Sequence, residues 1–150
     1  MRRTSNLSLL QIEEATDIAQ ARSELLLDQK PTGLIVSGKI LEAAVEVSAG
    51  RYVLFLTDDV IYEESLTVIL CSLTAGIEEI ITLGGAYSSG LFQQLIISDN
   101  RLSFRFIGDA IWHIEIENRP RFKLPFLGDP KGVKRKNRLG KIMNITTTQG

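Results

Sequence analysis

The sequence has very little of the two residues on which many enzyme mechanisms depend. Its 150 residues include one cysteine, Cys71, and one histidine, His113. A lone cysteine excludes an internal disulfide and is typical of a reducing compartment. One cysteine and one histidine also cannot supply the usual ligands of a structural zinc site. We therefore expect no catalytic residue, no metal site and no cofactor.

Long hydrophobic runs are absent as well. No apolar stretch approaches the roughly 18 residues that a membrane-spanning helix requires. The basic start Met1-Arg2-Arg3 is followed by Leu9-Leu10 and then by Glu13, Glu14 and Asp17, so the apolar core of a secretory signal is missing. These features predict a cytoplasmic protein with no membrane contact.

The composition is that of an ordinary globular chain. It is 44% hydrophobic and 23% charged, with 12 glycines and 4 prolines. This excludes a disordered, collagenous or disulfide-dependent protein. A chain of this length is typical of one domain, so we expect a single domain over residues 1–150.

The net charge of −1 hides a strong asymmetry. Residues 119–141 hold nine basic residues and only one acidic residue, a net charge of +8, so the rest of the chain carries −9. Such a distribution indicates either a charged partner or pairing of opposite charges within the protein. The two explanations remain open at this stage.

The first thirty residues suggest a helix. Ser8 and Gln11 have the spacing of an N-terminal capping box. Apolar residues then recur at roughly helical intervals until Pro31 and Gly33 end the pattern. We predict one amphipathic helix at residues 9–29, packed on the protein's own sheet or on a partner.

After Gly33 the period changes to two, which predicts an antiparallel β domain over residues 33–147. Residues 41–47 alternate with an acidic outer face, and residues 51–56 (RYVLFL) are almost continuously apolar, as in a strand covered on both faces. Residues 66–73 and 77–83 are two further strands joined by a turn.

Residues 91–117 contain the clearest pattern, a three-stranded antiparallel meander. Its reversals fall at Asp99-Asn100 and Gly108-Asp109, which favour the positive φ of two-residue hairpin turns. Residues 118–140 form a long irregular connection, and 141–147 a last strand. The fold class is therefore mainly β, an antiparallel meander of about eight strands forming a sandwich or open barrel, with one N-terminal amphipathic helix.

Neither His113 nor Cys71 suggests catalysis. The alternation puts His113 on the outer face of its strand, whereas a nucleophile–histidine pair requires a pocket. Cys71 stands between Leu70 and Ser72 in a strand, where a small buried apolar residue is expected.

An acidic cluster follows the RYVLFL strand. It consists of Asp58, Asp59, Glu63 and Glu64 around Tyr62. Carboxylates at a strand end can hold a hard cation or act as an acid–base pair, cap a solvated turn, or recognise a basic partner. Glu42, Glu46, Glu78 and Glu79 would enlarge the patch if their strands lie beside it.

The basic segment 131–141 suggests a nucleic-acid interface. Lys134, Arg135, Lys136 and Arg138 provide the clustered cations that phosphates require. The aromatic residues of the meander, however, fall on its core side, where they cannot stack on bases. Pairing with the protein's own acidic residues is the competing interpretation.

The stretch RYVLFLTDDVIYEESLTVILCSL, followed by SSGLFQQLIISDNRLSFRFIGDAIWHIEI, resembles small uncharacterised bacterial β-rich proteins of the toxin-immunity kind. The resemblance covers residues 38–147 and rests on a strand, an acidic turn and a hairpin meander. It carries no diagnostic motif. It implies stoichiometric binding of a basic protein through an acidic surface.

We therefore expect a non-enzymatic protein-binding module, with Asp58, Asp59, Tyr62, Glu63 and Glu64 at the interface. Two alternatives stay open: nucleic-acid binding through residues 131–141, and a divalent-cation-dependent hydrolase at residues 58–64. A homodimer through the apolar stripe of the 9–29 helix is a further option for assembly.

Overall fold

The protein is built from strands. The computed structural model describes residues 1–16, 19–58, 65–84, 90–122, 129–135 and 140–149, and these form thirteen strands and no helix. The strands assemble into three antiparallel sheets. The predicted mainly β, antiparallel class is therefore confirmed, whereas the expected number of about eight strands is wrong.

The central sheet has six strands in the order β1-β5-β6-β7-β8-β12. Their bounds are β1 Arg2–Arg3, β5 Ile40–Ser48, β6 Arg51–Thr57, β7 Leu66–Ser72, β8 Gly76–Leu83 and β12 Val133–Arg135. Strands β5 to β8 are consecutive hairpins, and the distant β1 and β12 pair with the two edges.

The other two sheets each come from one region of the chain. The N-terminal sheet contains β2 Leu7–Glu13, β3 Arg22–Leu27 and β4 Lys30–Ser37. The C-terminal sheet has the order β13-β11-β10-β9, with β9 Gln93–Ile97, β10 Arg101–Arg105, β11 Ala110–Phe122 and β13 Gly140–Gln149.

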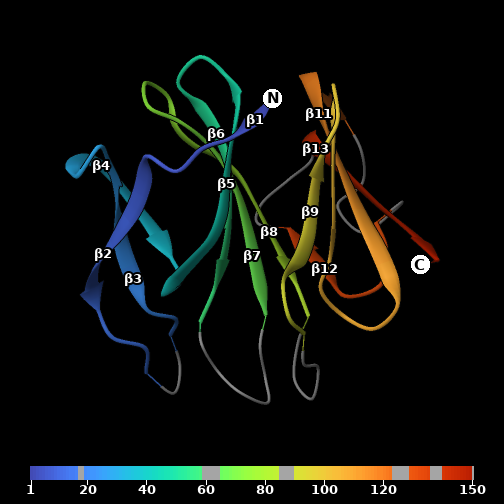
Figure 1. Ribbon diagram of the computed structural model, residues 1–150, viewed down its shortest axis with the longest axis horizontal. Helices are drawn as coiled ribbons and strands as arrows, with labels where there is room; N and C mark the ends of the chain where they lie inside the picture. Colours follow the sequence, from blue (N-terminus) through green and yellow to red (C-terminus); the bar gives the residue numbers. More distant parts are fainter. Residues whose placement is uncertain (17–18, 59–64, 85–89, 123–128, 136–139, 150) are drawn as a thin grey trace.

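The central sheet lies between the other two, so the protein has three layers (Figure 1). One face of β6, with Leu54 and Leu56, packs against Leu25 and Val36 of the N-terminal sheet. The opposite face, with Phe55, packs against the C-terminal sheet. The prediction that residues 51–56 are covered on both faces is confirmed, since Tyr52 to Leu56 are all buried.

The predicted helix at residues 9–29 is wrong. The segment instead forms β2 and β3, with Ser8 paired to Leu26 within the ladder. Ser23 and Leu25 are buried, Leu27 packs against the same cluster, and the chain reverses through positive φ at Asp28 (51°) and Gln29 (68°). A period-two face that can be buried on the central sheet outweighs the helical spacing, because packing overrides local propensity. Because the described residues of this segment form no helix, a homodimer through a helix at residues 9–29 is not possible.

The meander over residues 91–117 is confirmed as β9, β10 and β11, with the reversals at the predicted places. Gly108 has the expected positive φ of 61°, but Asp99 and Asn100 do not have positive φ, so that detail is wrong. The irregular connection at 118–140 is also wrong in part. Strand β11 continues to Phe122, and β12 pairs with β8.

Candidate partner-binding surface

Asp58 lies directly after β6, where it meets a segment from the other end of the sequence. The side-chain amide of Gln20 donates to Asp58 Oδ2 at 2.9 Å and to Thr67 Oγ1 at 3.4 Å. Gln20 precedes β3, so this contact links the β2–β3 connection to the start of the β6–β7 connection. Two segments that are far apart in sequence are therefore held together at one end of the layers (Figure 1).

Local geometry fixes the segment that presents Gln20. Thr16 accepts a hydrogen bond from the amide of Ala19 through Oγ1 (3.1 Å) and donates its own amide to the Ala19 carbonyl (2.9 Å). The amide of Gly38 donates to the Ala21 carbonyl at 2.8 Å. A Cβ at Gly38 would stand 2.9 Å from Leu56 Cβ, and its φ of +140° suits only glycine. The close approach to β6 explains why glycine occupies this position.

These two segments concentrate acidic residues. We call residues 13–20 and 57–65 the acidic loops: together they contain seven carboxylates and no lysine or arginine. Among the described ones, Glu14 is exposed and Glu13 pairs with Arg22 at 3.1 Å on the surface. Of the predicted interface residues, Asp58 is described, whereas Asp59, Tyr62, Glu63 and Glu64 lie outside the described residues.

The prediction that glutamates on neighbouring strands enlarge this acidic patch is largely wrong. Glu46 pairs with Arg2 at 3.0 Å, and Glu78 pairs with Arg51 at 2.8 Å. Glu79 is wholly buried. Only Glu42 lies beside the acidic loops, where its carboxylate accepts a hydrogen bond from Thr57 Oγ1 at 3.4 Å.

Glu79 and Arg135 form a buried ion pair between β8 and β12. Arg135 Nη1 lies 3.0 Å from Glu79 Oε1, and each side chain is only 1% exposed. The same guanidinium donates to both carboxylate oxygens of Asp129, at 2.7 and 3.0 Å. This is pairing of opposite charges within the protein, one of the two explanations for the charge asymmetry.

The ion pair also joins the central sheet to the edge of the C-terminal sheet. Glu79 accepts hydrogen bonds from the backbone amides of Ile142 (3.1 Å) and Met143 (2.9 Å) in β13. Arg135 donates to the Met143 carbonyl at 2.8 Å. The carboxylate and guanidinium thus occupy the backbone groups that a further strand would need.

The predicted basic surface is correspondingly reduced. Lys134 is exposed on β12, but the Arg135 guanidinium is enclosed by protein groups and does not face a phosphate. Lys136 and Arg138 lie outside the described residues. Nucleic-acid binding by the remaining cations of residues 131–141 stays a prediction.

His113 lies on the outer face of the C-terminal sheet, with a hydroxyl group beside each ring nitrogen. Its Nδ1 is 2.8 Å from Ser103 Oγ, and its Nε2 is 2.8 Å from Thr148 Oγ1. This arrangement was not predicted from the sequence, although the register of β10 and β11 places Ser103 opposite His113. A catalytic histidine usually has a carboxylate on the nitrogen that faces away from the nucleophile, and here a threonine holds that place.

We expect the imidazole of His113 to have a pKa below the usual value for histidine. Burial, helped by the Arg101 guanidinium, lowers the pKa of His113 from 6.5, and Glu115 opposes the shift only in part. In a proton NMR titration the single imidazole should therefore show a midpoint below 6.5. Because the folded pKa is depressed, its contribution to stability is present above pH 6.5 and is lost as the pH falls below that value. A midpoint at or above 6.5 would contradict this environment.

The prediction that Cys71 is a buried small residue is confirmed. Its side chain is wholly buried in β7, and burial together with nearby Glu78 raises the pKa of the Cys71 thiol to about 12. A thiol in this environment is not a nucleophile near neutral pH.

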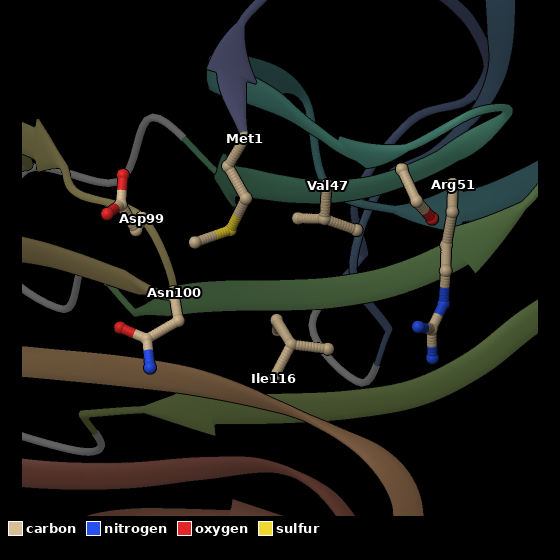
Figure 2. Close-up of a pocket in the computed structure, with 7 residues that line it drawn as sticks. Met1, Val47, Arg51, Asp99, Asn100 and Ile116 are labelled. Atoms are coloured by element: carbon tan, nitrogen blue, oxygen red, sulfur yellow. The ribbon is translucent and has the colours of Figure 1, made fainter.

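A small pocket opens between the edges of the central and C-terminal sheets (Figure 2). Its floor is apolar, with Val47 and Ile116 facing each other and the side chain of Met1 beside them, and its rim includes Asp99 and Arg51. Arg51 is already paired with Glu78. The volume of about 210 Å³ falls below the roughly 300–1,000 Å³ of typical small-molecule sites.

The described part of the chain offers no group of three histidine, cysteine, aspartate or glutamate side chains that could hold a metal ion. Within the same residues, no helix has the length and apolar character needed to cross a membrane. Searches against protein-family models, curated proteins and solved structures find no match to this chain.

Proposed function

We propose that this chain is a non-enzymatic protein-binding module that docks a basic protein through its acidic loops. The observation that carries the proposal is the hydrogen bond between Gln20 and Asp58, which joins one residue from each of two segments whose sequences together contain seven carboxylates. Concentrated charge of one sign accelerates the encounter with a partner of opposite charge. An immunity-type inhibitor of a basic toxin is the form of this function that the sequence suggests.

The framework supports such a role because it fixes the position from which the loops emerge. Asp58 follows a strand whose residues Tyr52 to Thr57 are all buried, and Gln20 adjoins the buried Ala21. A rigid scaffold reduces the ordering that binding would otherwise require. In the proposed complex Tyr62 supplies contact area, as aromatic residues commonly do at interfaces.

The proposal is tested by removing the negative charge of residues 58–64. The variant Asp58→Asn, Asp59→Asn, Glu63→Gln, Glu64→Gln should capture its basic partner from host lysate at least about tenfold more weakly, because removal of charge slows association. Capture is performed at low and moderate salt, with and without nuclease treatment, and affinity is then measured with the purified partner. Circular dichroism should show an unchanged fold.

A matched control neutralises four carboxylates elsewhere: Glu24, Asp28, Asp99 and Asp109. It removes the same charge but leaves the acidic loops intact, so capture should remain close to that of the native chain. Equal capture by the native chain and the loop variant would refute the proposal. Retention that depends on nucleic acid would transfer the function to residues 131–141.

A further inference from the structure

Strand β9 is the end strand of the C-terminal sheet and has no further strand beside it among the described residues. The side chain of Ile96 is 64% exposed on the outer face of this strand, next to Ser103 of β10. Leu95 and Ile97 point to the inner face, where they are only partly buried against the core. Both faces of this edge therefore present apolar side chains.

The backbone of β9 also has groups directed away from the sheet. The amide of Ser98 donates to the Arg101 carbonyl at 2.9 Å, so these two residues form a hydrogen-bonded pair. Pairs alternate in an antiparallel ladder, which makes Ile97 and Leu102 a non-hydrogen-bonded pair. The amide and carbonyl of Ile97 thus point outward. The carbonyl of Leu95 does so too, because it shares a trans peptide unit with the amide of Ile96, which points toward β10.

At the other edge of the same sheet, on β13, buried side chains bind the backbone groups. On β13, Glu79 and Arg135 occupy the backbone groups of Ile142 and Met143. Strand β9, with the sequence Gln-Gln-Leu-Ile-Ile, contains no charged residue, proline or glycine. Its one irregularity is at Gln94, which has a φ of +56° and lies at a shift of register. Residues 95–97 therefore form a regular, neutral edge of the kind that natural proteins usually protect.

We propose that β9 pairs with β9 of a second copy of this chain in an antiparallel, two-fold symmetric arrangement centred on Ile96. In this register Leu95 stands opposite Ile97 of the partner subunit, and Ile97 stands opposite Leu95 of the partner subunit. In each pair the amide of Ile97 donates to the carbonyl of Leu95 of the other copy, so two backbone hydrogen bonds form across the axis. Ile96 meets its own equivalent in the intervening close pair.

The self-complementary register is the reason for choosing a second copy as the occupant. A two-fold interface requires one surface patch to fit itself. Three consecutive apolar residues satisfy this requirement with no like charges brought together, and their hydrogen-bonding directions coincide about the axis. The two four-stranded C-terminal sheets become one continuous sheet of eight strands.

Cross-linking tests the register directly. In a non-hydrogen-bonded antiparallel pair the Cα atoms lie about 4.5 Å apart, within the range that a disulfide can bridge. The variant Ile96→Cys should therefore give a disulfide-linked dimer on mild oxidation, seen on a non-reducing gel. Cys71 does not interfere because it is wholly buried.

The matched control is Leu10→Cys, since Leu10 is also exposed (52%) but lies on β2 of the N-terminal sheet. It should cross-link only slowly. Light scattering should show a dimer for the native chain. A second variant, Ile96→Lys, places a charge at the two-fold axis and should abolish that dimer. Its thermal unfolding reports whether the fold is retained.

Three results would overturn the proposal: a native chain that is monomeric at its highest soluble concentration, a dimer that survives in a folded Ile96→Lys variant, or equal cross-linking of the two cysteine variants. Loss of a different protein partner in Ile96→Lys would assign the edge to strand addition by that protein instead. The acidic-loop variant should retain the dimer, which separates this test from that of the proposed function.

Discussion

Replacement of Glu79 by alanine is expected to lower the free energy of unfolding by about 3–5 kcal/mol, the usual cost of breaking a buried ion pair from one side. The variant leaves Arg135 buried with a charge that, among the described residues, only Asp129 offsets. It also removes the acceptor for two backbone amides of β13. Urea unfolding followed by the fluorescence of Trp112, the only tryptophan, gives the value.

The adjacent residue provides the control. Glu78 also pairs with an arginine, Arg51 at 2.8 Å, but both side chains are more than 20% exposed. Glu78→Gln should therefore cost only about 0–1 kcal/mol. Similar losses in the two variants would show that the buried network does not stabilise the fold.

The second large effect is expected at Phe55. Its ring lies 4.9 Å from the ring of Phe92 and 5.2 Å from that of Phe104, measured between centroids, and it is wholly buried between the central and C-terminal sheets. Phe55→Ala should destabilise the protein by about 3–5 kcal/mol, because it removes apolar contact and leaves a cavity.

The comparison for Phe55 is Ile77→Ala. Ile77 is a large apolar residue in the same sheet, but it is 37% exposed and leaves no enclosed cavity when truncated. Its substitution should have a much smaller effect in the same urea titration. If Phe55→Ala unfolds at the same urea concentration as the native chain, the aromatic cluster is not part of the cooperative core.

Strands β6, β7 and β8 could be predicted because the pattern of apolar residues in their sequences is compatible only with strands. Residues 51–56 are too short for a buried helix between the flanking turn signals and too uniformly apolar for a half-exposed strand. Residues 66–83 show the same pattern around Gly76. The structure therefore confirms these strands and the burial expected of residues 51–56.

The N-terminal hairpin could not be distinguished from a helix in the same way. Leu9 and Leu10 are adjacent, as are Leu25 and Leu26, so both periods find apolar partners in this segment. The decision depends on the neighbouring sheet, which offers a flat apolar face to Leu7 and Leu25. That information is not local to the segment.

The buried network had a visible signal that the sequence analysis did not use. Glu79 alternates with Ile81 and Leu83, so a strand at residues 77–83 puts a carboxylate on its core face. A charge in that position requires a buried partner. Its identity as Arg135 depends on β12 returning to β8, which no local pattern in residues 118–140 indicates. At the acidic loops, the sequence identified the charge but not the contact between Gln20 and Asp58.

The order of the strands has a consequence for how the chain is made. During synthesis, the N-terminal sheet and strands β5 to β8 leave the ribosome before the C-terminal sheet exists. Glu79 lacks its hydrogen-bond partners Arg135 and Met143 at this stage, because they follow it by 56 and 64 residues. Until they arrive, the face of the central sheet that carries Phe55 and Val68 has no cover. The nascent protein therefore exposes a large apolar surface until the C-terminal sheet has been synthesised, and the packing of that sheet on the central sheet completes this part of the core.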